Sequence, residues 1–210
     1  MERSPSLPAF GLTGGIACGK STVARYFREL GAYILDADCL GHELIEPGQL
    51  AYEQIVERFG KQILESAGGI DRRKLGAKVF ADTKALRALN AILHPRIIGR
   101  IDELAHAHQA RDPHAVIIVD APLIFEAGIA GNFRKVIVVW CRPEQQLERL
   151  MAKASLSRLE AEQRIRAQMP AEEKRRRADY VIDSSGSFEN LREQAGVIYA
   201  ELKWITTASS

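Results

Sequence analysis

The sequence predicts an α/β fold in which a parallel five-stranded sheet is flanked by helices. Residues 115–119 and 136–140 are continuous apolar runs, which are typical of strands buried on both faces of a parallel sheet. The first 36 residues hold a strand-type run, a glycine-rich loop, a helical pattern and a second strand-type run, in the order of a βαβ unit. With 210 residues, 46% of them hydrophobic, the chain is long enough for one domain, or for one domain with a helical insertion.

The first expected strand, residues 9–13, leads into a phosphate-binding loop motif. Residues 14–21 read Gly-Gly-Ile-Ala-Cys-Gly-Lys-Ser and fit the P-loop pattern G-x-x-x-x-G-K-[ST]. Glycines let such a loop curl so that backbone N–H groups face phosphate oxygens, and the positive end of the helix expected from Lys20 onward faces the same anion. Lys20 would reach the β- and γ-phosphates, and the Ser21 hydroxyl would ligate Mg²⁺. The alternative is a glycine-rich turn with an incidental lysine, which the order of strand, loop and helix makes the weaker interpretation.

Two carboxylates follow the second expected strand, residues 33–35. Asp36 and Asp38 lie at its carboxyl end, where ligands bind in open α/β sheets. A phosphoryl-transfer enzyme needs a carboxylate that orients or deprotonates the attacking hydroxyl, and Asp38 is the candidate. The alternative is that both aspartates cap the helix that follows, and residue propensity alone favours that alternative. The neighbouring phosphate-loop motif shifts the balance toward a catalytic Asp38.

The pattern from residue 39 to residue 111 is helical, which predicts an insertion between the second and third strands. Asp71 is placed to cap one of its helices. We expect another helix to end at Pro95 and a further one to follow, because proline lacks the backbone N–H that a helix interior needs. His94 would then be a residue at a helix C-terminus, and nothing local requires it to be a ligand.

Asp120 follows the third expected strand, at a position typical of a Walker B aspartate that holds Mg²⁺ through water. A strand-end turn aspartate before Pro122 is the alternative. The fourth strand is expected at residues 136–140 and a short last strand at 180–182. Helical patterns fill residues 144–153, 158–169 and 188–202.

A basic run, Lys174 to Arg177, follows Glu172 and Glu173. The two glutamates balance the run at i, i+3 and i, i+4 spacing, so a solvated helix face is the default interpretation. The same C-terminal stretch carries further arginines. The hypothesis beside the default is that some of these cations close over the phosphates as a lid, because arginine meets the charge of a transferring phosphoryl group.

The bulk composition excludes several classes of function. The formal net charge is +2, from 29 basic and 27 acidic residues, which gives no argument for a nucleic-acid partner. No apolar run approaches the roughly 20 residues of a membrane span, and residues 1–8 lack the apolar core of a signal peptide. Cys18, Cys39 and Cys141 have no C-x-x-C spacing and suggest neither disulfides nor zinc. These features predict a reduced, cytoplasmic enzyme without a membrane partner, and they leave the oligomeric state open.

Taken together, these motifs resemble the dephospho-coenzyme A kinase family. The matching elements, in chain order, are Leu12 to Ile16 with Gly19 to Thr22, Asp36-Ala37-Asp38, Glu46-Pro47-Gly48, Leu89 to Arg96, Pro122 to Glu126, Ala167 to Lys174, Arg177 to Asp183, and Ser185-Gly186. The phosphate loop alone is generic. The joint occurrence of the Asp36-Ala37-Asp38 and His94-Pro95 elements at this distance is specific, and the likeness extends from Phe10 to about residue 202.

The resemblance implies a P-loop kinase core (about residues 9–38, 114–143 and 179–204), a helical acceptor-binding insertion (about 39–113) and a helical lid (about 144–178). It implies transfer of the γ-phosphate of ATP to the ribose 3′-hydroxyl of dephospho-coenzyme A, the last step of coenzyme A synthesis, with Mg²⁺. Together with the motif above, the expected site has Asp38 and Lys20 as catalytic residues; Gly14, Gly15, Ile16, Ala17, Cys18, Gly19, Lys20, Ser21, Thr22, Arg149, Ser185 and Gly186 for ATP; His94, Arg96 and Asp38 for the acceptor; and Ser21 and Asp120 for the metal.

Other functions stay open on the sequence. Another nucleoside or metabolite kinase would use the same core. A nucleotide-switch GTPase would need an Asn-Lys-x-Asp element after a later strand, and Val139 to Pro143, after the fourth strand, do not supply it. The intact Gly19-Lys20-Ser21 and Asp38 speak against a catalytically inactive interaction protein.

Four positions depart from the family's usual pattern. Ala17 stands where the family usually has glycine, and we expect its φ to be negative because alanine is strained in the left-handed region. Cys18 stands in place of serine; a thiol near a helix N-terminus favours its thiolate and would be open to oxidation or alkylation, while a mere small replacement for serine is the favoured alternative. Lys153-Ala154 replaces the common Arg-Asp, so Arg149 or Arg158 is expected to serve as the main lid cation.

Overall fold

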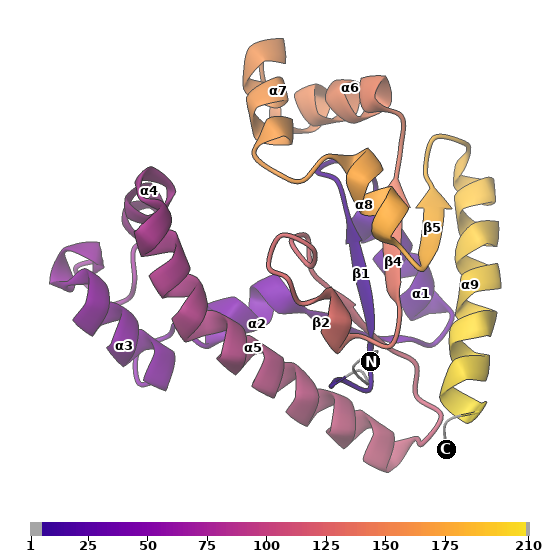
Figure 1. Ribbon diagram of the computed structural model, residues 1–210, viewed down its shortest axis with the longest axis horizontal. Coiled ribbons are helices and arrows are strands. Elements are labelled where there is room, and N and C mark those ends of the chain that lie inside the picture. The colour runs from indigo at the N-terminus through magenta and orange to yellow at the C-terminus, as the bar shows by residue number, and fades with distance from the viewer. Residues whose placement is uncertain (1–5, 209–210) are drawn as a thin grey trace. The chain divides into compact units, whose positions relative to one another are not determined.

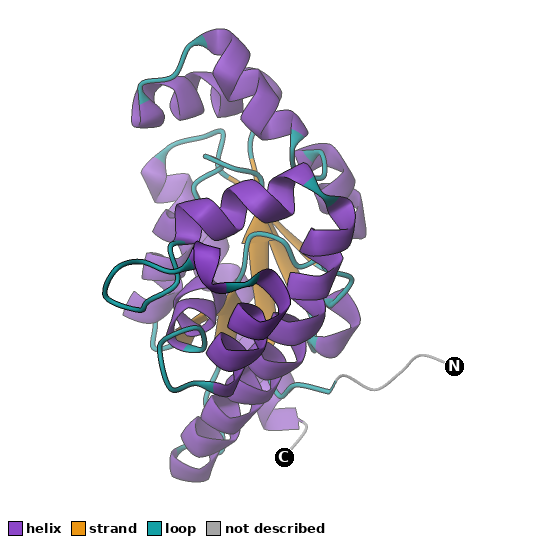
Figure 2. Cartoon of the chain, turned by 90° about the vertical axis from the view of Figure 1, so that its left-hand side faces the viewer, coloured by secondary structure: helices purple, strands orange, loops and turns teal. Residues whose placement is uncertain are grey.

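The computed structural model describes residues 6–208, apart from the side chains of Phe80 and Ala81. The strands are β1 (Phe10–Gly14), β2 (Tyr33–Asp36), β3 (Ile117–Asp120), β4 (Val136–Trp140) and β5 (Tyr180–Asp183). The helices are α1 (Lys20–Glu29), α2 (Ala37–Glu43), α3 (Leu50–Phe59), α4 (Arg72–Ala81), α5 (Thr83–Arg111), α6 (Pro143–Ala154), α7 (Arg158–Arg166), α8 (Ala171–Arg177) and α9 (Phe188–Ala208). Two short 3₁₀ helices, η1 (Lys61–Ile63) and η2 (Ala130–Asn132), lie in connections. Figure 2 shows that helices make up most of the chain and that the strands are confined to one sheet.

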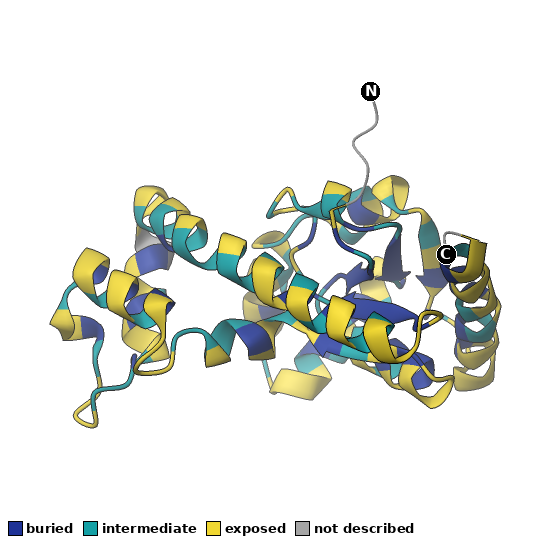
Figure 3. Ribbon diagram, turned by 90° about the horizontal axis from the view of Figure 1, so that it is seen from below, coloured by how far each residue is buried: buried dark blue, intermediate teal, exposed yellow. Residues whose placement is uncertain are grey.

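The five strands form one sheet in the order β2-β3-β1-β4-β5. β1 lies at its centre and pairs in parallel with β3 and β4, and β4 pairs in parallel with β5 (Figure 1). The register sets Leu12 opposite both Asp120 and Ile137. Every residue of β1 is buried, as is most of β4, and the strands are accordingly dark in Figure 3. The predicted parallel α/β fold is confirmed.

Helices α1 and α9 cover a face of this sheet. Phe27 on α1 and Leu202 on α9 are fully buried in one apolar cluster with Ile118 and Ile137 of the strands. α1 begins at Lys20, as the motif predicts, and Gly31, at φ +105°, lies just beyond its end. A glycine in this left-handed conformation after a helix lets the chain turn away from the helix axis into β2.

The contacts divide the chain into two compact units: the residues up to Leu35 with those from Leu104 onward, and Asp36–Glu103. The second unit is helical and has its own apolar core, which includes Ile55, Phe59 and Leu75. Asp71 accepts hydrogen bonds from the backbone N–H groups of Arg73 and Lys74 and caps α4, as predicted. Within the described part of the chain, no helix combines the length and the apolar character needed to cross a bilayer.

The expected helix break at Pro95 is wrong, because α5 runs through it from Thr83 to Arg111. Pro95 has no N–H for the carbonyl of residue 91, and a proline at this point distorts the ladder. The Arg96 guanidinium donates a hydrogen bond of 2.7 Å to the carbonyl of Ile92, the residue next to the carbonyl that Pro95 leaves without a helical donor. Leu89 before the proline and Ile101 after it are both buried, so packing on both sides holds the helix continuous. Likewise the helix expected at 158–169 ends earlier, at Arg166.

Candidate active site

The phosphate-loop motif lies between β1 and α1, in the strand–loop–helix order that the motif requires. Two of its glycines are demanded by close approaches. A Cβ on Gly14 would lie 2.5 Å from the Val139 carbonyl oxygen, and one on Gly15 would lie 2.6 Å from Nε2 of Gln146. Gly19 has φ +90°, in the region that favours glycine. The loop therefore packs so tightly against β4 and α6 that its glycines are needed for space as well as for curvature.

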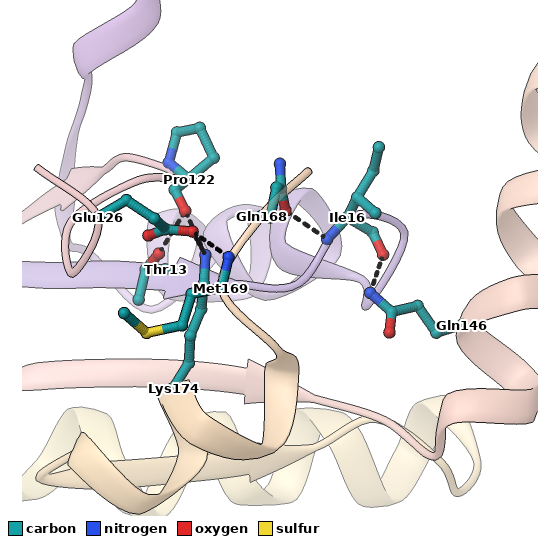
Figure 4. Close-up of polar contacts among 8 residues, drawn as sticks. All are labelled: Thr13, Ile16, Pro122, Glu126, Gln146, Gln168, Met169 and Lys174. Carbon is teal, nitrogen blue, oxygen red and sulfur yellow. Dashed lines mark hydrogen bonds and ion pairs between the residues drawn. The ribbon is translucent and has the colours of Figure 1, made fainter. Parts of the chain in front are cut away.

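Ala17 adopts φ +60°, so the expectation of a negative φ is wrong. A non-glycine residue in this left-handed region costs about 1–2 kcal/mol, because its Cβ crowds the backbone. Both neighbours of Ala17 are hydrogen-bonded. The Ile16 N–H donates to Oε1 of Gln168 over 3.2 Å, and the Ile16 carbonyl accepts from Nε2 of Gln146 over 2.9 Å (Figure 4). The Cys18 carbonyl accepts from the Ser184 hydroxyl over 2.7 Å. The surrounding structure thus imposes a conformation that local sterics oppose.

Lys20 and Asp120, which the motif and its strand position single out, form an ion pair. Lys20 opens α1 and Asp120 closes β3, and the two meet because β1 and β3 are neighbours in the sheet. The exposed fractions are 20% for the Lys20 side chain and 12% for that of Asp120, so the pair is only partly shielded from water. Ser21 follows Lys20 and is exposed. The site thus presents an ammonium, a carboxylate and a hydroxyl at the end of the loop.

An open pocket of about 440 Å³ adjoins the same loop. Its lining residues are Ala17, Gly19, Thr22, Arg149, Ser184, Gly186, Ser187, Phe188, Glu189 and Leu191. The structure thus brings Arg149 and Gly186 to the loop, as expected from the resemblance. The Arg149 guanidinium donates to the hydroxyl (3.1 Å) and the carbonyl (2.8 Å) of Ser184. Arg158, the other expected cation, pairs with Glu162 on an exposed face of α7.

Two features of this pocket, Phe188 and Ser184, were not predicted from the sequence. Phe188 is 69% exposed although it lines the pocket, and it opens α9. Ser184 joins Arg149 to the Cys18 carbonyl. Ser185 itself is not among the lining residues; its hydroxyl accepts from the Arg142 N–H and its carbonyl from the Gln145 side chain, so it fastens the β5–α9 turn to the start of α6. An exposed aromatic after a Ser-Ser-Gly-Ser turn is the signal that could have indicated Phe188.

The hypothesis of a thiolate at Cys18, the less favoured of the two, is contradicted by the surroundings of the thiol. Cys18 is fully buried, and its Sγ lies 3.3 Å from Sγ of Cys141, at hydrogen-bond distance. The hydrogen bond to Cys141 and the loss of solvent both raise the pKa of Cys18 far above its usual range. Burial therefore outweighs the nearby helix N-terminus, and the favoured alternative, a small replacement for serine, agrees with this packing.

Lys174 does not lie on a solvated helix face, contrary to the default interpretation. Its side chain is fully buried, and Nζ lies 2.8 Å from both the Glu126 carboxylate and the Pro122 carbonyl oxygen (Figure 4). Thr13, in β1, donates to the same Pro122 carbonyl. The Glu126 carboxylate also accepts from the Met169 N–H. Lys174 thus ties α8 to the loop after β3.

The neighbouring arginines behave as expected, because Arg175, Arg176 and Arg177 are exposed and pair with Glu172 or Glu173. A helical pattern could have indicated the exception, because Ala171 and Lys174 share one face of α8 at i, i+3 spacing.

The remaining candidates belong to the Asp36–Glu103 unit. Asp36 accepts from the Cys39 N–H over 2.9 Å and caps α2, so the capping alternative holds for Asp36. Asp38 lies exposed in the first turn of the same helix. His94 is half-buried on α5, and this burial lowers its pKa.

Arg96 lines a pocket of about 490 Å³ within that unit, with Glu43, Leu44, Gln49, Leu50, Ala51, Gly99, Arg100 and Glu103. It also donates to the Gln54 side chain over 3.0 Å. The pocket was not expected from the sequence, and Arg100, one turn after Arg96, is the second cation that it adds. His94 is not among its lining residues.

Comparison with known proteins gives a consistent result. The family described as Dephospho-CoA kinase matches residues 9–190. A dephospho-CoA kinase of Carboxydothermus hydrogenoformans is 46% identical over 198 residues, which cover 94% of this chain and 96% of the relative. A crystal structure from Thermus thermophilus is 34% identical with a TM-score of 0.77, covering 95% of this chain and 99% of that one. A dephospho-CoA kinase from Campylobacter jejuni is 31% identical with a TM-score of 0.68, covering 97% and 99%. These findings do not favour a different nucleoside or metabolite kinase.

Proposed function

The chain belongs to the dephospho-CoA kinase family, and on that premise we propose that it transfers the γ-phosphate of ATP to the ribose 3′-hydroxyl of dephospho-coenzyme A, giving ADP and coenzyme A. The observation that carries the proposal is the Lys20–Asp120 pair at the end of a complete phosphate-binding loop. The site needs no covalent catalysis, because positioning and electrostatics supply most of the acceleration in phosphoryl transfer.

The nucleotide is assigned to the loop and its adjoining pocket. Residues Gly14 to Thr22 would hold the phosphates through backbone N–H groups and through Lys20. On binding, Lys20 would exchange its contact with the Asp120 carboxylate for contacts with phosphate oxygens. Arg149 and Phe188 line the pocket beside the loop, and the adenine would stack on the exposed Phe188 ring beside the Ser185–Gly186 turn.

A magnesium ion fits the donors at the end of the loop. Mg²⁺ prefers hard oxygen ligands, and two oxygen donors occur here: the Asp120 carboxylate, which pairs with Lys20, and the hydroxyl of Ser21, the residue after Lys20. Asp120 is held by β3 and cannot move far, whereas Ser21 is exposed and accessible. When bound, the ion would neutralise charge on the phosphates.

The acceptor is assigned to the helical unit. We propose that Asp38 orients, and accepts a proton from, the ribose 3′-hydroxyl, as the carboxylate that such a reaction requires. Arg96 and Arg100 line one pocket and would bind phosphate groups of the acceptor, since guanidinium forks match phosphate geometry. His94, on the same helix, is assigned to the acceptor side with them. Residues 39–113 would then be the acceptor-binding insertion, and 144–178 the lid. We expect the reaction to take place in the cytoplasm.

The first experiment is Mg²⁺-ATP turnover with dephospho-coenzyme A, with adenosine and shikimate as control acceptors. Product with dephospho-coenzyme A alone supports the proposal. Retained ATP binding without turnover of any acceptor would contradict it.

Asp38→Asn then tests the proposed base. We expect turnover to fall by about 10²–10⁴-fold, the usual contribution of a general base, while ATP binding is unchanged. Asp36→Asn is the matched control, because it removes the same charge two residues away and asparagine caps a helix as well as aspartate does. Loss of ATP binding in Asp38→Asn would instead assign a structural role to Asp38.

A further inference from the structure

The loop carries an alanine where its conformation favours glycine. Ala17, at φ +60°, is one of two non-glycine residues with positive φ in the described part of the chain, and it lies in the middle of the phosphate-binding loop. Such strain persists only where neighbouring contacts over-determine the backbone. The contacts on either side of Ala17 therefore indicate what holds the loop in this shape.

Both polar groups of the preceding residue, Ile16, are bound by glutamine side chains from the lid segment. Gln168, in the connection between α7 and α8, accepts from the Ile16 N–H over 3.2 Å. Gln146, on α6, donates to the Ile16 carbonyl over 2.9 Å. Figure 4 shows the two glutamines reaching Ile16 from different directions, Gln146 from α6 and Gln168 from the connection between α7 and α8. The two bonds span 152 and 130 residues of sequence, so they form only in the folded protein.

Each glutamine is itself held in place. Gln146 is only 5% exposed, and it packs so closely on the loop that a Cβ on residue 15 would lie 2.6 Å from its Nε2. Gln168 precedes Met169, whose N–H donates to Glu126, the partner of the fully buried Lys174. The lid segment therefore meets the loop through a fixed donor and a fixed acceptor. These two bonds bind the two peptide units that flank Ile16, the residue immediately before the strained one.

We propose that Gln146 and Gln168 are positioning residues for nucleotide binding: by fixing both polar groups of Ile16, they hold Ala17 in the left-handed conformation that the phosphate-binding loop needs. The proposal deepens the proposed function and rests on nucleotide binding by this loop. It explains how the chain tolerates alanine at position 17. In the absence of either glutamine contact, Ala17 relaxes toward negative φ and the loop must be rebuilt when nucleotide binds.

The test is a coupling experiment between Gln168→Met and Ala17→Gly. Methionine keeps the length of the side chain but has no strong acceptor. We expect Gln168→Met to weaken binding of MgADP about tenfold in calorimetry, which corresponds to 1.4 kcal/mol. In the Ala17→Gly background the same change is expected to weaken binding by less than about threefold, because glycine adopts positive φ without strain. Gln163→Met, on an exposed face of α7, is the matched control and is expected to change binding by less than about twofold in both backgrounds.

Equal losses in the two backgrounds would overturn the proposal, because Gln168 would then act without the loop. No loss in either background would also overturn it. Gln146→Met is the second variant and is expected to show the same pattern. If it fails to fold because residue 146 is buried, the half-exposed Gln168 still decides the outcome.

Thermal unfolding of the nucleotide-free protein gives a reading independent of kinase activity. Ala17→Gly is expected to raise the melting temperature of the parent protein. In the Gln168→Met background the increase is expected to be smaller, because Ala17 has already relaxed toward negative φ there and less strain remains to be relieved. An equal gain in both backgrounds would overturn the proposal. This reading stays decisive even if the acceptor proves to be a different molecule, so failure of the loop proposal and failure of the proposed function are distinguishable.

Discussion

The two units of the chain build their candidate sites in different ways. In the first unit, the contacts of the site connect distant parts of the sequence: Lys20 with Asp120, Ile16 with Gln168, and Cys18 with Ser184, across 100 to 166 residues. In the Asp36–Glu103 unit, Asp36 bonds to a backbone group three residues away and Arg96 to one four residues away, and the Arg96–Gln54 bond spans 42. The proposed nucleotide site is thus stabilised by contacts between distant parts of the chain, while the proposed acceptor site presents side chains from locally stabilised helices.

The difference has a functional meaning. A phosphate chain is the same in every nucleotide, so a rigid, pre-formed cradle is suited to it. The proposed acceptor pocket is lined by Arg96 and Arg100, whose long side chains come from one helix of the other unit. The comparison therefore predicts large and general effects for changes in the first unit, and separable, substrate-specific effects for changes in the second.

The largest effect is expected for Lys20→Met. It removes the cation that we propose binds the phosphates and breaks the ion pair with Asp120, so turnover should fall by about 10³-fold. Steady-state kinetics with Mg²⁺-ATP and dephospho-coenzyme A measure it. Lys203→Met, on an exposed part of α9, is the control and should leave turnover unchanged. Activity within tenfold of the parent in Lys20→Met would break the assignment of the nucleotide site to the first unit.

Arg96→Met should separate the two units. We expect the KM for the acceptor to rise about tenfold, the loss of one charge-assisted contact, while the KM for ATP stays within twofold. Because Arg96 also donates to the Ile92 carbonyl, the melting temperature of the Arg96→Met variant must be compared with that of Arg87→Met, which changes an exposed arginine on the same helix. A parallel rise in both KM values would show that the helical unit does not act separately.

Ala17→Gly should stabilise the protein by about 1 kcal/mol, since glycine is free of the left-handed strain. The matched control is Ala152→Gly, at an exposed position of α6, which should destabilise by about 1 kcal/mol because glycine weakens a helix. Chemical unfolding measures both. The same sign of change at the two positions would mean that the loop is not strained at Ala17.

The smallest effect concerns His94. Burial of this side chain lowers its pKa. As pH falls below the ordinary value of 6.5, the unfolded chain takes up the proton before the folded protein does, so stability is present above that pH and declines below it. His94→Gln should flatten the decline in unfolding free energy between about pH 6.5 and 5.5. Urea unfolding across this range measures the slope, and an unchanged slope in the variant would contradict the effect of burial.

How much the sequence could predict differs by feature. Local composition and turn chemistry were enough to predict several elements. These are the strands at Phe10–Gly14 and Val136–Trp140, the start of α1 at Lys20 and the helix cap at Asp71. The continuous helix through Pro95 was not, because burial of Leu89 and Ile101 overrides a local penalty. Lys174 was misplaced for the same kind of reason: its partners, Pro122 and Glu126, are remote in the chain.

By itself, then, the sequence determined the α/β class, the phosphate loop and the family, since apolar periodicity and a contiguous motif are local properties. The tertiary structure alone decided that Ala17 is left-handed, that Cys18 is buried against Cys141, and that the N–H and carbonyl of Ile16 bond to Gln168 and Gln146. These features depend on contacts across more than 100 residues, whose energies offset local preferences only once the chain has folded.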